Sequence, residues 1–336
     1  MPERGGGRDF FQESESGHID LPRALKGGFA GGFFAIFVPN PHTSRHAKKN
    51  ASKPEFDASQ PYSAPPLDLA YAQRMTNGMM AQLIQIERLS AGKFRVARTV
   101  SDIEHCLQQN ILAAVLHFEG AECIDADFDA LDVYHAAGLR SLGLVWSRPN
   151  AFATGVPFAY PSPPDTGPGL TEIGMELVER CNSLKIMIDL SHLNERGFWD
   201  VADASDAPLV ATHSAVHEIC PHSRNLTDKQ IDAIGASGGI IGINCYVGNL
   251  REDGKCDAVT PLPQWVKHVN YVVDRIGIDH VAIGSDFDGA TMPDDLKDVS
   301  GLPKLIAALS DSGYSSSDIS RIAHENWLAV LKKTWR

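Results

Sequence analysis

The chain has 336 residues, of which 43% are hydrophobic, and a formal net charge of −12 at pH 7. This length and hydrophobic content can bury a sizeable core, either as one large domain or as two ordinary ones. The acidic balance argues against nucleic acids and anionic membrane surfaces as partners.

The N-terminal segment MPERGGGRDFFQESES is polar and acidic, and it lacks the apolar centre of a signal peptide. The longest apolar stretch, GFAGGFFAIFV at residues 28–38, is rich in glycine and too short to span a bilayer. Six cysteines are scattered without a C-x-x-C pair, which predicts buried free thiols rather than a disulfide framework. We therefore expect a cytoplasmic protein without a membrane segment.

Beyond a loop excursion at about residues 40–66, short apolar runs alternate with amphipathic helical patterns. The helical patterns cover residues 171–184, 227–234, 263–277 and 315–331. Strands are predicted at residues 33–38, 111–119, 139–146, 185–192, 208–214, 239–246 and 280–286. Continuous apolar strands that alternate with helices are typical of a parallel sheet covered by helices on both sides.

Polar side chains end several of these strands. Their positions distinguish a doubly wound open sheet from a barrel, the two architectures that fit alternating strands and helices. Glu119, His192 and Asp286 end their strands, and His213 lies near the end of another. In a doubly wound open sheet, the site would gather at one switch point. Catalytic groups at the C-terminal ends of several strands are instead the arrangement of a (β/α)8 barrel. We therefore predict a TIM-type α/β barrel in which residues 1–336 form a single catalytic domain.

The same residues predict a metal centre. A lone histidine at a strand end is more often a structural residue, but four polar groups at one barrel mouth would be costly to bury unpaired. Glu119, His192 and His213 offer the oxygen and nitrogen ligands that suit zinc, and two ions could hold a bridging hydroxide. Asp286 could then move protons. Arg224 could clamp a substrate carboxylate, although for an arginine taken alone a surface salt bridge is the simpler reading.

Several longer stretches together resemble the membrane (renal) dipeptidase family of zinc peptidases. The resemblance runs from about residue 16 nearly to the C-terminus, on GGFAGGFFAIFVP, HFEGAE, GLTEIGMELVERCNSLKIMIDLSH, THSAVHEICPHSRNLTDKQ and IGSDFDGA. It implies an amidohydrolase-type barrel that hydrolyses dipeptides, often with a D-residue at the C-terminal position. It also implies two zinc ions, and homodimers are found among relatives.

The resemblance assigns a role to each matching residue. Glu119 would bridge the two ions, and His192 and His213 would hold the second one. Arg224 would bind the C-terminal carboxylate of the substrate, and Asp286 would handle protons.

Two aromatic residues, Trp146 and Tyr246, are also predicted to line the substrate pocket. Trp146 departs from the family pattern, because animal members carry a histidine there that contacts the substrate carbonyl. An indole has one donor and no basic nitrogen, so the segment around Trp146 is expected to shape a different pocket.

The segment GHID raises a further question, because the family holds its first metal with a His-x-Asp pair at the end of strand one. His18 and Asp20 have that spacing, but the preceding residues QESESG are too polar for a buried strand. The order of the ligands along the chain fits the family only if residues 33–38 form strand two. We therefore expect His18 and Asp20 to lie in a loop near the barrel mouth, and strand one to be absent from this chain.

A start upstream of Met1 is the plainest cause of the absent strand. In a natural variant with a degraded first site, His18 and Asp20 could instead act as substitute ligands, as could His117.

Two other functions fit parts of the pattern. An amidohydrolase-type N-acyl-amino-acid deacylase would also use a carboxylate anchor, and a free-amine requirement in the substrate would separate it from a dipeptidase. A catalytically impaired barrel relative would explain a missing strand. The retained polar residues argue against impairment, because a dead site gains stability when unpaired buried polar groups are replaced.

Overall fold

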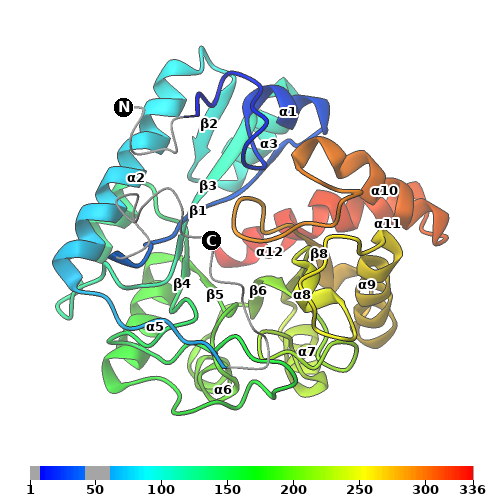
Figure 1. Cartoon of the computed structure of the whole chain (residues 1–336). Helices are drawn as coiled ribbons and strands as arrows, with labels where there is room; N and C mark the ends of the chain where they lie inside the picture. The colour runs from blue at the N-terminus through cyan, green and yellow to red at the C-terminus, as the bar shows by residue number, and fades with distance from the viewer. Residues whose placement is uncertain (1–7, 42–60, 336) are drawn as a thin grey trace.

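The computed structural model describes residues 8–41 and 61–335. Its strands pair in parallel and curl into a ring, and the helices lie around the outside (Figure 1). The strands are β1 (Gly31–Ile36), β2 (Phe94–Ala97), β3 (Leu112–Glu119), β4 (Ser141–Gly143), β5 (Met187–Asp189), β6 (Val210–Ser214), β7 (Ile240–Asn244) and β8 (Val281–Gly284).

The order of the strands confirms the predicted β/α barrel. From β3 to β8, each strand pairs with the next one along the chain, and the order never reverses. A doubly wound sheet would reverse at a switch point. Strands β3 and β7 are buried along nearly their whole length, which is why they read as continuous apolar runs.

The seven predicted strands are all present, with bounds that differ by a few residues. Strand β1 begins at Gly31, two residues before the predicted start. Strand β2 was not predicted: it is four residues long, and Phe94 and Ala97 are buried while Arg95 is exposed. It pairs with the first half of β3, whose second half pairs with β4.

Helices connect the strands and cover their outer face. The longer ones are α2 (Leu69–Leu89), α3 (Val100–Gln109), α4 (Asp129–Ala137), α5 (Glu172–Leu184), α6 (Glu195–Ala204), α7 (Asp228–Ala236), α9 (Leu262–Ile276), α10 (Leu302–Asp311) and α12 (Asn326–Thr334). Short elements are α1 (Leu21–Lys26), α8 (Val247–Leu250), η2 (Ile278–His280), η3 (Val299–Gly301), α11 (Ser316–Ser320) and η4 (Arg321–Glu325).

The predicted helices at residues 171–184, 227–234 and 263–277 correspond to α5, α7 and α9. The expected capping box is also present, because Thr227 N donates to the side chain of Gln230. The predicted helix at residues 315–331 is instead divided into α11, the π-helical turn η4 and α12. Most of the predicted excursion at residues 40–66 lies outside the described residues, since residues 42–60 are not described.

Helix α12 closes the end of the barrel opposite to the mouth. Val330 and Leu331 of α12 are buried against residues from the starts of four strands, namely Met187, Val210, Ile240 and Ala282. This packing fills the N-terminal end of the ring. The C-terminal ends of the strands, where Glu119 and His213 lie, therefore remain accessible to a substrate.

The ring of strands has a gap between β1 and β8. In the described part of the chain, no ladder joins these two strands, and residues 8–20 form no strand, as their polar sequence predicts. A cavity of about 2470 Å³ runs from the mouth into the gap, where Phe33, Ile283 and Trp327 line it. This volume exceeds that of an ordinary ligand pocket because the mouth and the gap form one space.

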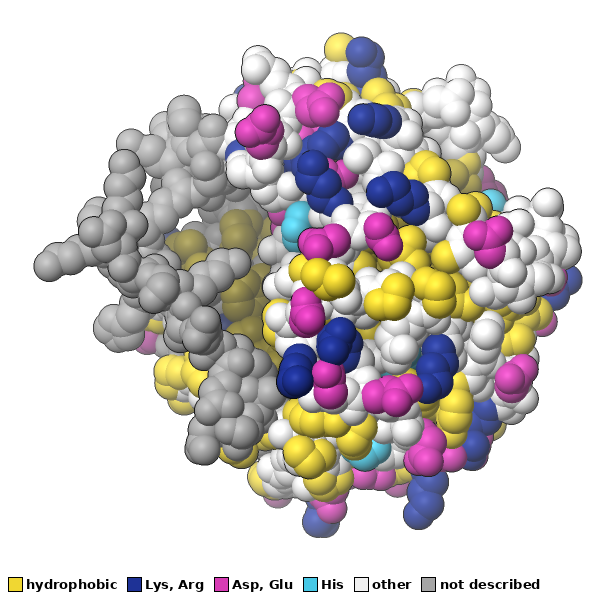
Figure 2. Space-filling model, turned by 45° about the vertical axis from the view of Figure 1, so that its right-hand side comes forward, with side chains coloured by type: hydrophobic (Ala, Val, Ile, Leu, Met, Phe, Trp, Pro, Cys, Tyr) yellow, Lys and Arg dark blue, Asp and Glu magenta, His cyan; other side chains and the backbone are white. Residues whose placement is uncertain are grey.

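The surface carries charges of both signs. On the face in Figure 2, acidic and basic side chains are interspersed and neither sign forms a continuous field. No helix among the described residues is both long enough and apolar enough to cross a membrane. All six cysteines are free, as predicted, and Cys256 is exposed while the other five are buried.

Candidate metal centre

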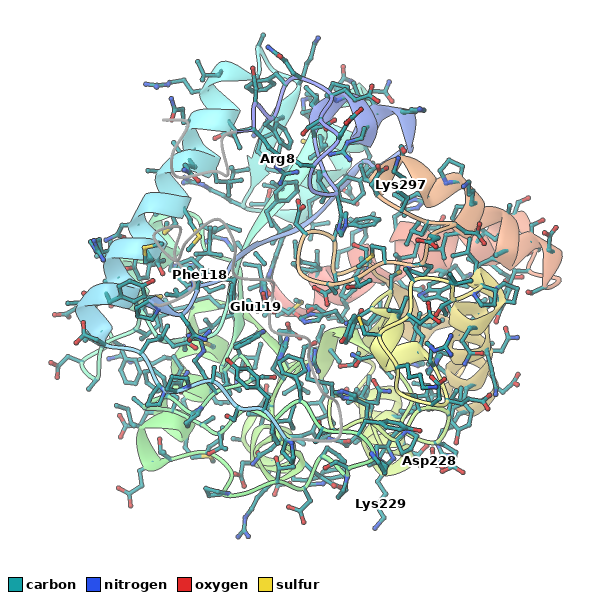
Figure 3. All side chains as sticks on the ribbon, in the orientation of Figure 1. Arg8, Phe118, Glu119, Asp228, Lys229 and Lys297 are labelled. Atoms are coloured by element: carbon teal, nitrogen blue, oxygen red, sulfur yellow. The ribbon has the colours of Figure 1, made fainter. Side chains whose placement is uncertain are left out.

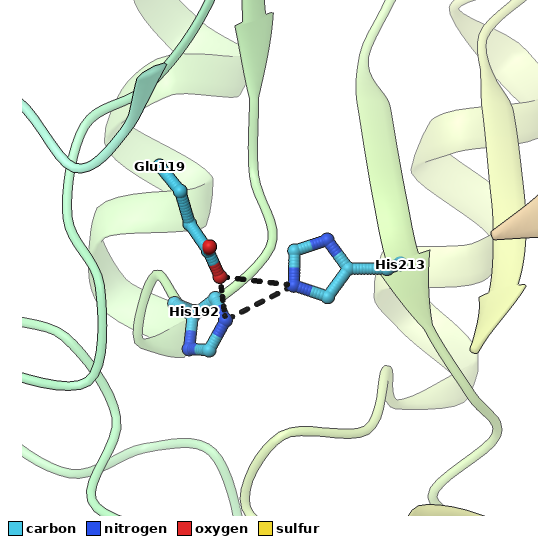
Figure 4. Close-up of side chains that lie close together, drawn as sticks. All are labelled: Glu119, His192 and His213. Atoms are coloured by element: carbon cyan, nitrogen blue, oxygen red, sulfur yellow. Dashed lines mark hydrogen bonds and ion pairs between the residues drawn. The ribbon is translucent and has the colours of Figure 1, made fainter. Parts of the chain in front are cut away.

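Three side chains from different strands converge at the mouth of the barrel (Figure 4). Glu119 is the last residue of β3, His192 follows β5, and His213 lies in β6. The Nε2 atoms of His192 and His213 are 3.0 Å apart. Glu119 Oε1 lies 3.1 Å from Nε2 of His192 and 3.6 Å from Nε2 of His213. Within residues 8–41 and 61–335, no other set of three such side chains comes this close together.

The tautomer of His213 follows from its neighbours. The Thr212 hydroxyl donates to Oδ2 of Asp189 over 2.6 Å, because an ionised carboxylate can only accept. The Thr212 oxygen lies 2.8 Å from Nδ1 of His213 and must then accept from Nδ1–H. Nε2 of His213 therefore carries a lone pair at the point where the three side chains meet.

Asp189 is well suited to stay ionised in this arrangement. The net shift of the pKa of its carboxyl is downward despite burial, and two hydrogen bonds from Thr212 contribute to this shift. Its Oδ1 atom also accepts from the backbone N–H of Ser191 at 3.0 Å. The carboxylate thus anchors Thr212, and Thr212 in turn orients the ring of His213.

Both histidines are neutral, which is the form that binds metal. Burial lowers the pKa of His192 well below its ordinary value, and the nearby charge of Arg224 adds to this. Burial also lowers the pKa of His213. The Nδ1 atom of His192 is paired with the Ser147 hydroxyl at 2.9 Å, which leaves its Nε2 atom facing Glu119.

The three ligand atoms fit a divalent cation such as zinc. Atoms that lie 2.0–2.1 Å from a tetrahedral zinc ion are about 3.4 Å from one another, close to the separations of 3.0, 3.1 and 3.6 Å seen here. Burial, and then the charge of Asp286, raises the pKa of Glu119 well above its ordinary value. A bound cation would reverse this effect and keep Glu119 ionised.

The hydroxyl of Thr212 gives a testable prediction for metal affinity. Thr212→Val removes the hydroxyl that fixes the tautomer of His213, and we expect zinc affinity to fall about 10- to 100-fold. Competition with a chelator of known affinity measures this change. Thr212→Ser keeps the hydroxyl and is the matched control. Equal zinc affinities for the two variants would show that Thr212 does not orient His213.

The other predicted site residues line the same cavity. Arg224 is buried, and its Nη2 atom donates to the carbonyl oxygen of His213 at 3.0 Å. Burial lowers the pKa of Arg224 to about 10, although Asp286 opposes this shift, so the guanidinium stays charged at neutral pH. Asp286 follows β8, and its Oδ2 atom accepts from Asn244 Nδ2 at 3.1 Å. Tyr246 follows β7, and burial raises the pKa of its hydroxyl.

Trp146 forms part of an aromatic wall beside the ligands. Its ring centroid lies 4.9 Å from that of Phe37, 5.5 Å from that of Phe158 and 5.8 Å from that of His192. The buried guanidinium of Arg148 lies over the indole of Trp146, 4.8 Å from the ring centroid, as a cation–π pair. An apolar surface therefore lies beside His192, as the departure of Trp146 from the family resemblance predicts.

Two of the three proposed substitute ligands, His18 and Asp20, are bonded elsewhere. Asp20 caps α1 by accepting from Arg23 N at 2.9 Å, and it also forms an ion pair with Arg23 Nε at 2.6 Å. His18 accepts from the backbone N–H of Asp288. His117 lies in β3, where its Nδ1 atom is 2.8 Å from the Ser141 hydroxyl. None of the three belongs to the ligand group.

Several supporting residues were not identified from the sequence. Thr212 directly precedes His213, and Asp189 lies three positions before His192. Both are polar residues inside apolar strands, which is a signal that could have pointed to them. Asn244 ends β7 in the way that Glu119 ends β3, so the rule that identified Glu119 could also have identified Asn244.

Comparison with solved structures shows close similarity over almost the whole chain. A metallo peptidase from Rhodobacter sphaeroides, liganded with a phosphinate mimic of the dipeptide L-Ala-D-Ala, is 48% identical with a TM-score of 0.91. The match covers 97% of this chain and 93% of that one. The dipeptidase AC structure is 46% identical with a TM-score of 0.90, and the match covers 97% and 92% of the two chains.

Sequence comparison agrees. An uncharacterized protein in the pqqA 5′ region of Klebsiella pneumoniae is 46% identical over 271 residues, which cover 81% of this chain and 98% of that protein. A family model described as membrane dipeptidase (peptidase family M19) matches residues 6–335. The chain therefore belongs to the membrane dipeptidase family.

Proposed function

We propose that this chain is a zinc-dependent dipeptidase that hydrolyses the peptide bond of dipeptides, including those with a D-residue at the C-terminal position. The observation that carries the proposal is the convergence of Glu119, His192 and His213 in a cavity that Arg224 also lines. A metal centre and a buried cation in one cavity suit a substrate with a scissile carbonyl and a free carboxylate. The dipeptide mimic in the Rhodobacter structure supports this substrate class.

The residues of the chain divide the work between binding and proton transfer. When bound, zinc would polarise the scissile carbonyl and make water a stronger acid. Arg224 would bind the substrate carboxylate with paired hydrogen bonds, since its guanidinium is charged and lies on the cavity wall. Asp286, oriented by Asn244, would accept a proton from the attacking water and return it to the leaving amine.

The aromatic residues would shape the rest of the pocket. Trp146, with Phe37 and Phe158 against it, offers an apolar wall next to His192. Such a wall suits an apolar substrate side chain better than a polar contact to the substrate carbonyl. Tyr246 lines the same cavity and would contact the substrate there.

We propose that this chain binds one zinc ion firmly. The family resemblance implies two ions with Glu119 between them, but the described residues bring together a ligand set for one. The gap between β1 and β8 is consistent with an incomplete first site. A single catalytic domain, a cytoplasmic location and a homodimer stay predictions from the sequence and the resemblance.

A comparison of two substrates tests this function. The purified, zinc-loaded chain is expected to release D-alanine from L-Ala-D-Ala but not from N-acetyl-D-alanine, which has no free amine. Removal of zinc with a chelator should abolish the activity and readdition should restore it. Release from N-acetyl-D-alanine alone would favour the deacylase, and release from neither substrate would favour the impaired relative.

A further inference from the structure

We infer that His18, in the segment GHID, is a positioning residue that clasps the loop carrying Asp286. The backbone N–H of His18 donates to Oδ1 of Asp288 at 2.7 Å, and the backbone N–H of Asp288 donates to Nδ1 of His18 at 2.8 Å. The two residues are 270 positions apart in the sequence and form a reciprocal pair. The catalytic consequence rests on the proposed function, whereas the clasp itself does not.

The loop after β8 depends on outside contacts for its shape. Asp286 and Asp288 both have left-handed backbone conformations, with φ of 59° and 65°. Residues other than glycine adopt this region at a cost in energy, so surrounding contacts must hold it. No helix or strand begins between β8 and η3, which leaves the loop without a regular hydrogen-bond ladder.

The hydrogen bonds between His18 and Asp288 lie close to Asp286 in the loop. Asp288 is two residues from Asp286, and the ring of Phe287 between them meets the ring of His18 edge-on, with centroids 6.0 Å apart. On its other side, Asp286 is held through its carboxylate by Asn244. The backbone of Asp288, two residues from Asp286, is therefore held by the N-terminal segment, and the side chain of Asp286 is held by Asn244 of β7.

The N-terminal segment is itself firmly anchored, so it can serve as a support. Arg23 is buried, and its guanidinium pairs with Asp20 at 2.6 Å and with Asp298 at 3.0 Å. It also donates to the carbonyl oxygen of Gly17, next to His18, at 2.9 Å. The N–H of Val299 donates to the carbonyl oxygen of His18 at 3.1 Å. These bonds fasten both sides of His18 to the region around η3.

This arrangement gives the GHID segment a role other than metal binding. Figure 3 labels Arg8 and Lys297 above Glu119, and both line the cavity. Arg8 also reaches Asp288, with Nη2 3.3 Å from Oδ2. His18 and Arg8 thus both join the N-terminal segment to Asp288 across the rim of the site.

The ring of His18 must be neutral to accept at Nδ1. Burial lowers the pKa of His18, and Arg23 and Arg8 act in the same direction, while Asp288 and Asp298 oppose them. The net shift is downward, so the ring is neutral at pH 7. A neutral side chain that places an acceptor at the same position should therefore preserve the hydrogen bond from Asp288 N–H.

Two matched variants test the clasp. His18→Asn places an oxygen acceptor near the position of Nδ1, whereas His18→Leu has a similar shape and no acceptor. Hydrogen exchange of residues 285–292, followed by mass spectrometry, should be faster in His18→Leu and close to wild type in His18→Asn. Unchanged exchange in His18→Leu would overturn the clasp, provided that thermal unfolding shows both variants folded.

Kinetics test the consequence for catalysis. In His18→Leu we expect kcat for L-Ala-D-Ala to fall about 10- to 100-fold with KM changed less than about twofold, and His18→Asn to restore kcat. Faster exchange with an unchanged kcat would overturn the positioning role. If the wild-type chain hydrolyses no dipeptide, the proposed function fails, while the exchange experiment still decides the clasp.

Discussion

Replacing His213 by alanine is expected to weaken zinc binding by more than about 100-fold and to abolish dipeptide hydrolysis. His213 supplies one of three converging ligand atoms, and even residues that merely orient a ligand change metal affinity 10- to 100-fold. The chain should stay folded, because His213 lies at the rim of the barrel rather than in its apolar core. Zinc content after dialysis and the rate of hydrolysis are the two measurements.

A second histidine provides the control for this substitution. His105 lies exposed on α3, away from the cavity, and His105→Ala should leave both zinc content and hydrolysis unchanged. Circular dichroism and thermal unfolding compare the folded state of the two variants. Full activity of folded His213→Ala would contradict a mechanism that depends on this metal centre.

Replacing Arg224 by methionine is expected to lower kcat/KM for L-Ala-D-Ala by roughly 30- to 1000-fold. This range corresponds to about 2–4 kcal/mol, which is typical when one partner of a buried, hydrogen-bonded charge pair is removed. Most of the loss should be in KM, because on the proposed function the guanidinium would bind the carboxylate in both the ground state and the transition state. Zinc content should not change, since Arg224 is not among the ligand atoms.

The dipeptide amide, L-Ala-D-Ala-NH₂, separates this role from a structural one. It lacks the carboxylate, so the wild-type enzyme should cleave it poorly and Arg224→Met should cleave it no worse than the wild type does. Arg224→Lys keeps a positive charge without the paired donors. Its kcat/KM for L-Ala-D-Ala should lie between the values of the wild type and Arg224→Met. An equal loss on the acid and on the amide would show that Arg224 supports the fold, through its bond to His213, rather than the substrate.

Most of the barrel could be predicted from the sequence because its strands are buried on both faces. Strands β3 and β7 read as continuous apolar runs, and α5 and α7 show one buried face and clear caps. Strand β2 could not be predicted in the same way. It has four residues, one of them an exposed arginine, and it is stabilised by pairing with β3 rather than by its own pattern.

The convergence of the candidate ligands was easier to predict from the sequence than the contacts of their supporting residues. Glu119, His192 and His213 stand at strand ends, where parallel strands bring side chains together. The bond from Thr212 to Asp189 and the clasp between His18 and Asp288 depend on contacts between distant segments, which no local pattern encodes. The sequence could therefore predict no strand in the residues directly before His18, but it could not show the paired hydrogen bonds between His18 and Asp288.

The most direct test is the zinc content of the purified chain, measured by elemental analysis after zinc loading and desalting. The geometry predicts about one ion per chain, bound by Glu119, His192 and His213, and its loss in His213→Ala. A ratio near two would mean that a second set of ligands exists and that the site is complete. A ratio near zero in the folded, zinc-loaded chain would contradict the metal centre and the dipeptidase mechanism with it.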